Sequence, residues 1–144
     1  MCGKTSTETV RDAMTPKPTV VRKEATAMEA ARTLATDNVG SLPVVQGDEL
    51  VGIVTDRDLV VRVLAKDLDP HKVPVADVCT ESPVVAAPDD PLGTALRRMA
   101  EAQVRRLPVV EDGRLVGILA QADVARTASQ SDTGALVEEI SQEA

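Results

Sequence analysis

The pattern of apolar and polar positions occurs twice in this chain, with a shift of 65 residues. The segment Leu-Pro-Val-Val at 42–45 recurs at 107–110, and Leu-Val-Gly-Ile-Val at 50–54 recurs as Leu-Val-Gly-Ile-Leu at 115–119. The same shift places Asp58 on Asp123 without a gap. Two copies of one unit, at about 10–64 and 75–127, therefore follow each other in the chain.

Each copy predicts the element order β-α-β-β-α. Short apolar runs at 18–21 and 83–85 predict the first strand. Apolar runs on both sides of polar, glycine-containing turns at 46–49 and 111–114 predict a hairpin. A helix is predicted between these parts and another after the hairpin.

The helices are predicted from their caps and their apolar spacing. Thr26 with Glu29 has the spacing of a capping box, and Asp89-Asp90-Pro91 predicts a cap followed by a first-turn proline. For the first helix of each copy we expect these buried faces: Met28, Ala31, Leu34 and Ala35, then Leu92, Ala95, Leu96 and Met99. For the second helix of the first copy we expect Leu59, Val60, Val63 and Leu64.

These elements predict an α+β fold in which two small units share a core. A three-stranded sheet with two helices is too small to bury its apolar face well alone, so we expect the copies to pack through their sheets with pseudo-two-fold symmetry. The expected parts are 8–66, a linker at 67–73, 74–128, and a polar acidic tail at 129–144. Clefts between such units are common places for small ligands.

Composition excludes several classes of function. The 144 residues include 23 Asp+Glu against 16 Lys+Arg, a net charge of -7, and no Phe, Tyr or Trp. We therefore expect no nucleic-acid or anionic-membrane surface and no stacking platform for bases. The start of the chain has no apolar signal region and no uncharged run is long enough to span a bilayer, so a cytoplasmic protein is expected.

Cysteine and histidine offer little chemistry in this sequence. Cys2 and Cys79 with the single histidine, His71, are too few for a structural zinc site, so no metal is expected. Cys79 is interpreted as a buried structural thiol, with a Cys2–Cys79 redox bridge as the alternative. His71 is expected to be exposed in the connector. With no nucleophile–base pair, the chain is not expected to be an enzyme.

Thr55 and Asp58 mark the passage from the last strand of the first copy into a helix, and two interpretations stay open. One is a helix cap with a first-turn acid. The other is a ligand site, in which helix amides, Thr55 and Arg57 hold an anion and Asp58 accepts hydrogen bonds from a vicinal diol such as a ribose. The second interpretation suits a nucleotide.

The repeat resembles a known family, the CBS domain. The resemblance is carried by Thr-Val-Arg-Asp-Ala-Met-Thr at 9–15, by Leu-Pro-Val-Val, and by Gly-Ile-Val-Thr-Asp-Arg-Asp at 52–58. Two such motifs in one chain look like a CBS pair, or Bateman module. Asn-Val-Gly-Ser-Leu-Pro and Gln-Val-Arg-Arg-Leu-Pro, at 38–43 and 103–108, look most like small stand-alone actinobacterial CBS pairs of the hypoxic response protein type.

The resemblance implies an adenosine-containing ligand in the cleft between the motifs: AMP, ADP, ATP, S-adenosylmethionine or NAD. In that family the site is built crosswise from both motifs. Asp58 would then hold the ribose hydroxyls, Thr55 the ribose or phosphate, and Arg106 the phosphates. The implied ligand residues are Thr55, Arg57, Asp58, Thr80, Ser82, Pro83, Arg105 and Arg106. Alternatively, Arg105 and Arg106 form ion pairs with Glu111 and Asp112 and bind no ligand.

A second, degenerate site is implied at the symmetry-related position. Its residues are Thr15, Lys17, Pro18, Ser41, Ala120 and Asp123. Because Ala120 stands where the first copy has Thr55, and Ala122 where it has Arg57, the hydroxyl and a cation are lost. We expect this site to be empty or weak for nucleotides.

The function implied by the resemblance is a non-catalytic sensor that responds to an adenosine-type ligand. The alternative is a ligand-free stress-response protein that acts as a homodimer on another protein. The resemblance implies a homodimer, and the second helix supports this expectation because it carries more apolar positions than one stripe needs. The tail, with Leu136, Val137 and Ile140, is expected to dock on a partner subunit or to stay loose.

Overall fold

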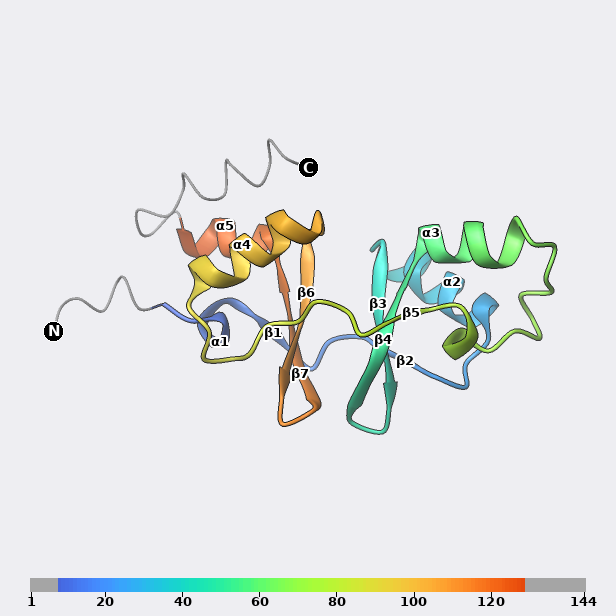
Figure 1. The fold of residues 1–144 in the computed structure, drawn as a ribbon, viewed down its shortest axis with the longest axis horizontal. Coiled ribbons are helices and arrows are strands. Elements are labelled where there is room, and N and C mark those ends of the chain that lie inside the picture. Colours follow the sequence, from blue (N-terminus) through green and yellow to red (C-terminus); the bar gives the residue numbers. More distant parts are fainter. Residues whose placement is uncertain (1–7, 129–144) are drawn as a thin grey trace, which may run out of the picture. The chain divides into compact units, whose positions relative to one another are not determined.

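The computed structural model describes residues 8–128, which divide into two compact units. The central unit is Thr19–Pro83, and the flanking unit is formed by the residues before and after it. Residues 1–7 and 129–144 lie outside the described residues. The expectations for Cys2 and for the acidic tail at 129–144 therefore fall outside them too. Helices and strands are mixed in each unit, so the α+β class is confirmed (Figure 1).

In the central unit, a four-stranded sheet has helices packed on it. Its strand order is β2-β3-β4-β5, with β2 parallel to β3 and the other pairs antiparallel. The elements are β2 (Val21–Arg22), α2 (Ala27–Asp37), β3 (Ser41–Gln46), β4 (Glu49–Thr55), α3 (Asp56–Leu59), the π-helix η2 (Val60–Leu64), the 3-10 helix η3 (Val75–Asp77) and β5 (Thr80–Glu81).

The flanking unit repeats this plan with the hairpin of the second copy. Strands β6 and β7 pair antiparallel, β1 adds to β7, and Ala86 forms a single parallel bridge to β6 at Val109. The elements are α1 (Val10–Ala13), β1 (Thr15–Pro16), α4 (Leu92–Ala102), β6 (Arg106–Glu111), β7 (Arg114–Ala120) and α5 (Gln121–Ala128). In Figure 1, α4 and α5 cover one end of this hairpin.

Both hairpins confirm the repeat down to their irregularities. Each ladder shifts register at one place, between Val44 and Val45 in the first and between Val109 and Val110 in the second. These positions are again 65 residues apart. The turns differ: Asp112 and Gly113 are both left-handed, at φ 55° and 80°, whereas in the first turn only Gly47 has a positive φ, of 63°.

The segment that opens each copy pairs with the hairpin of the other copy. Strand β1, from the first copy, pairs with β7, and β5, from the second copy, pairs with β4. The compact units therefore do not follow the copies as the sequence repeats them: the central unit takes Thr80 from the second copy. This exchange decides which side chains surround Asp58.

Several local expectations were wrong. The expected first strands start late, because ladder pairing begins only at Val21, opposite Val44, and at Ala86, opposite Val109. Pro91 is itself the N-cap of α4, with no side-chain cap bond. The carboxylate of Asp90 instead accepts from the Ala87 N–H at 2.9 Å and from Arg98 at 2.8 Å.

Each unit has its own apolar core. The buried face of α4 is the expected one. In α2, Leu34 is buried as expected and Ala35 is exposed, contrary to expectation. The other buried residues of α2 are Ala27 and Ala30, each one position before the expected residue. In the helix after β4, Leu59 and Val63 are buried but Val60 and Leu64 are exposed. The two cores contain, respectively, Val44, Val54 and Val75, and Leu96, Met99 and Leu107.

Candidate functional site

Thr55 and Asp58 form a reciprocal capping box where β4 passes into α3. The Thr55 N–H donates to Asp58 Oδ2 at 3.0 Å, and the Asp58 N–H donates to Thr55 Oγ1 at 2.9 Å. The helix-cap interpretation is therefore confirmed. It does not exclude the ligand interpretation, because a cap uses one carboxylate oxygen and leaves Oδ1 outside it.

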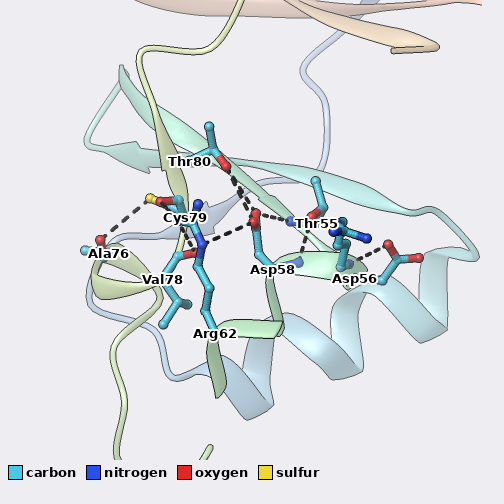
Figure 2. Close-up of polar contacts among 9 residues, drawn as sticks. Thr55, Asp56, Asp58, Arg62, Ala76, Val78, Cys79 and Thr80 are labelled. Carbon is cyan, nitrogen blue, oxygen red and sulfur yellow. Dashed lines mark hydrogen bonds and ion pairs between the residues drawn. The ribbon is translucent and has the colours of Figure 1, made fainter. Parts of the chain in front are cut away.

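Asp58 is the one buried charged residue among those whose side chains the structure describes, with 8% of the residue exposed. The Thr80 hydroxyl, on β5, donates to both of its carboxylate oxygens at 3.5 Å, which is long for such a bond. A buried carboxylate is costly unless it is paired, so partners of this kind are expected around it. Figure 2 shows Thr80 above Asp58, with the hydroxyl pointing at the carboxylate.

Arg62 approaches the same carboxylate from one turn further along the chain. Its Nε lies 3.8 Å from Asp58 Oδ1. Its Nη1 donates to the main-chain oxygens of Val78 and Cys79 at 3.3 and 3.2 Å. The site in the central unit thus has three side chains in mutual contact with Asp58: Thr55, Thr80 and Arg62.

The other residues predicted for this site lie at varied places. Arg57 is exposed in the first turn of α3, and Ser82 is exposed with a left-handed φ of 52°. Pro83 is half-buried at the end of the central unit. Arg105 and Arg106 belong to the flanking unit, where Arg106 opens β6 and the Arg105 main-chain oxygen accepts from the Gln121 N–H at 2.8 Å.

The residues predicted for the second site are divided between the units. In the flanking unit, the Thr15 hydroxyl donates to Asp123 Oδ2 at 3.5 Å, the counterpart of Thr80 and Asp58. Ala120 ends β7, and Lys17, at φ 52°, and Pro18 follow β1. Ser41 lies in the central unit, directly opposite Thr55 in the β3–β4 ladder.

Comparison with known proteins identifies the repeated unit. A family model described as "CBS domain" matches residues 10–65 and 75–129. The chain belongs to the CBS domain family. It is 37% identical to the CBS domain-containing protein YhcV of Bacillus subtilis over 93% of this chain and 96% of that protein. It is also 37% identical to Hypoxic response protein 1 of Mycobacterium tuberculosis over 82% of this chain and 83% of that protein.

Solved CBS-pair structures share the fold. Hypoxic Response Protein I with two coordinated zinc ions has a TM-score of 0.77 at 36% identity, covering 83% of this chain and 98% of that one. CBSX2 of Arabidopsis thaliana in complex with AMP has a TM-score of 0.74 at 37% identity, covering 85% and 96%. The CBS pair of MJ0100, with 5-methylthioadenosine and S-adenosyl-L-methionine, has a TM-score of 0.70 at 30% identity, covering 83% and 98%.

Residues 8–128 of this CBS pair hold neither a cluster of metal ligands nor a membrane-spanning helix. No group of three or more His, Cys, Asp or Glu side chains is arranged to hold a metal ion in that part of the chain. Over the same range, no helix is long and apolar enough to cross a membrane. His71 is exposed in the connector, as expected.

Cys79 is a buried thiol beside the site, which confirms the structural interpretation of this residue. It is 5% exposed, and Sγ lies 3.7 Å from the main-chain oxygen of Ala76. Burial raises the pKa of the Cys79 thiol, and the nearby carboxylates of Glu81 and Asp58 raise it further. The thiol is therefore a poor nucleophile in the folded protein.

This raised pKa predicts a loss of stability in base. The unfolded thiol ionises near pH 8.5, whereas the folded thiol still holds its proton there, so the free energy of unfolding falls as pH rises above that value. Urea unfolding at pH 7 and pH 9.5 is expected to show a larger decrease for the wild-type protein than for Cys79→Ala. An equal decrease in both proteins would contradict a raised thiol pKa.

Arg62 is the site residue that sequence reasoning missed. Its signal is present in the sequence, because Asp58 and Arg62 are four positions apart on one helix, the spacing of an ion pair. The apolar residues on both sides of Arg62 indicated a packed helix face instead of an ion pair. The second copy lacks this ion-pair spacing, since Thr127 stands at the position that corresponds to Arg62.

Proposed function

We propose that this CBS pair is a non-catalytic regulatory module that binds an adenosine-containing ligand through Asp58. The observation that carries the proposal is a buried carboxylate, Asp58, which faces the hydroxyl of Thr80 from the other sequence copy. Related CBS pairs in complex with AMP, and with S-adenosyl-L-methionine and 5-methylthioadenosine, support the ligand class.

The geometry around Asp58 suits the vicinal hydroxyls of a ribose. Two adjacent hydroxyl donors match the two oxygens of one carboxylate, and hydrogen bonds to a charged acceptor are roughly twice as strong as neutral ones. Among the described residues, Oδ1 has only the long contacts to Thr80 and Arg62, at 3.5 and 3.8 Å, so it retains capacity to accept. With no aromatic residue in the chain, the base has no aromatic ring to stack on.

A regulatory role without catalysis is supported by the state of the reactive groups. The single histidine is exposed in the connector, and Cys79 is buried with its pKa raised, which disfavours the thiolate. Within the described part of the chain, neither the imidazole nor the thiol is hydrogen-bonded to a group that could act with it as nucleophile and base. Ligand binding at Asp58 would instead change the stability and packing of the CBS pair, which is how a sensor signals.

A thermal-melting screen with AMP, ATP, S-adenosylmethionine and NADH tests the proposal. A ligand at 100 times its dissociation constant stabilises the folded state by about 2.7 kcal/mol, so at least one of the four is expected to raise the melting temperature by several degrees. Guanosine monophosphate, which has the ribose and phosphate of AMP but a different base, is included as the control nucleotide. No shift with any adenosine compound at millimolar concentration would defeat the proposal.

A homodimer is also proposed, and the exposed face of the α3–η2 segment favours it. Val60, Val61 and Leu64 are 54%, 42% and 62% exposed on one short stretch of helix. Clustered exposed apolar side chains commonly mark an interaction surface. Self-association through this face would also serve a CBS pair that acts on another protein without a small ligand.

Sedimentation equilibrium provides the test of self-association. The wild-type chain is expected at twice its mass of 15.2 kDa, and Leu64→Glu at the monomer mass, because a charge in an apolar interface is strongly disfavoured. Val84→Glu, at a residue that is 45% exposed in the flanking unit, is the control and should remain dimeric. A wild-type protein of 15.2 kDa in solution would contradict the dimer.

A further inference from the structure

The Arg62 guanidinium joins two parts of the Asp58 site. Through Nη1 it donates to the carbonyls of Val78 and Cys79, the two residues directly before Thr80. Through Nε it lies 3.8 Å from the Asp58 carboxylate. Figure 2 shows the side chain rising from η2 between these two parts.

The distances show that Arg62 holds the segment before Thr80 and leaves the Asp58 carboxylate oxygens open to a ligand. At 3.8 Å, Nε is too far from Oδ1 to make a hydrogen bond, so Arg62 does not use the lone pairs that a ligand hydroxyl would need. The bonds to the two carbonyls are within hydrogen-bond range. The firm attachment of Arg62 is therefore to the segment before Thr80, while its charge offsets the cost of burying Asp58.

Strand β5 is held to β4 by very few main-chain pairs. It contains only Thr80 and Glu81, and it pairs with β4 at two positions. In the flanking unit, the residue that corresponds to Arg62 is Thr127, whose hydroxyl donates to the main-chain oxygen of Asp123 at 3.2 Å. Thr127 is too short to reach from its own helix turn to another segment in the way Arg62 does.

We infer that Arg62 is a positioning residue that holds the 78–79 segment so that Thr80 and Asp58 face a ribose diol together. It thereby sets the preference of the site for ribose over 2′-deoxyribose. The inference rests on the proposed function, since it concerns the selectivity of the same site. Arg62 itself need not contact the ligand.

Two readouts on Arg62→Gln test the inference, with Arg32→Gln, at an exposed arginine of α2, as the matched control. The first needs no ligand: it is the rate of Cys79 alkylation, followed by peptide mass analysis. Because Arg62 lowers the pKa of the Cys79 thiol, the rate is divided by the thiolate fraction of each variant, and it then measures how firmly the 78–80 segment is held. The second is the ratio of the dissociation constants for 2′-deoxy-AMP and AMP, measured well below the melting temperature. Arg62→Lys separates charge from the planar guanidinium.

In Arg62→Gln we expect Cys79 to be alkylated at least about tenfold faster. We also expect the ratio of the dissociation constants for 2′-deoxy-AMP and AMP to be at least about tenfold closer to one. That change corresponds to the loss of about one well-placed hydrogen bond to the carboxylate. Arg32→Gln should match the wild type in both readouts. Arg62→Lys should not restore the ratio, because an ammonium group cannot reach both carbonyls and the carboxylate region in one plane.

Each other outcome overturns a definite part of the account. Unchanged alkylation in Arg62→Gln overturns the inference, whatever nucleotide binding shows. An unchanged ratio, or its full restoration by lysine, also overturns the inference but leaves the proposed function intact. If the wild type binds neither AMP nor 2′-deoxy-AMP, the proposed function fails, and the ligand selectivity inferred here fails with it.

Discussion

Asp58→Ala is expected to abolish the increase in melting temperature that an adenosine ligand produces and to lower the free energy of unfolding by about 1–2 kcal/mol. The loss of ligand response follows from removing both acceptor oxygens for the ribose hydroxyls. The loss of stability follows from the capping box, in which Asp58 Oδ2 accepts from the Thr55 N–H at 3.0 Å. Urea unfolding and melting with and without AMP measure the two effects separately.

Two companion variants keep these effects apart. Asp58→Asn retains an oxygen that can accept from Thr55, so it should recover most of the stability while binding the ligand weakly. Asp123→Ala removes the corresponding carboxylate of the flanking unit and should affect the AMP response less. A normal response in Asp58→Ala, at a temperature where the protein is folded, would place the ligand elsewhere.

Gly52→Ala is expected to destabilise the protein by about 1–3 kcal/mol and to weaken ligand binding as well. An added Cβ would lie 2.5 Å from the main-chain oxygen of Thr80 and 3.1 Å from Cys79 Sγ. The first of these atoms belongs to the backbone of β5, which can only give way by moving off β4. Because Thr80 moves with β5, its hydroxyl would leave Asp58.

Gly40→Ala is the control for the glycine series. There an added Cβ would be 3.5 Å from Asp56 Oδ2, an ordinary contact, and the backbone needs no left-handed φ. Its free energy of unfolding should stay within about 0.5 kcal/mol of the wild type. If Gly52→Ala unfolds at the same urea concentration as Gly40→Ala, the close approach of β4 and β5 is contradicted.

The repeat and its hairpins could be predicted from the sequence because apolar runs around polar turns determine the strand pairing locally. The buried face of α4 could be predicted for the same reason, since Leu92, Leu96 and Met99 are large and regularly spaced. The face of α2 could not, because it is rich in alanine, and small side chains on several faces give no clear stripe. Here Ala27 and Ala30 are buried and Ala35 is exposed.

The residues of the candidate site could likewise be predicted only in part. Thr55 and Asp58 could be found because the cap and the family motif coincide in one short segment. Arg62 could not be found from apolar spacing, since its role depends on carbonyls at Val78 and Cys79 that lie far along the chain. Long-range main-chain contacts of this kind leave no periodic signal. The cap expected at Asp89-Asp90 failed because Arg98 and the Ala87 N–H engage the Asp90 carboxylate.

A crystal structure of the wild-type chain grown with saturating AMP tests the central claim most directly. The account predicts electron density for the nucleotide with both ribose hydroxyls within about 3.2 Å of the Asp58 carboxylate oxygens, the range of a hydrogen bond. Density that shows AMP bound away from Asp58, or ordered water in its place at that concentration, would contradict it.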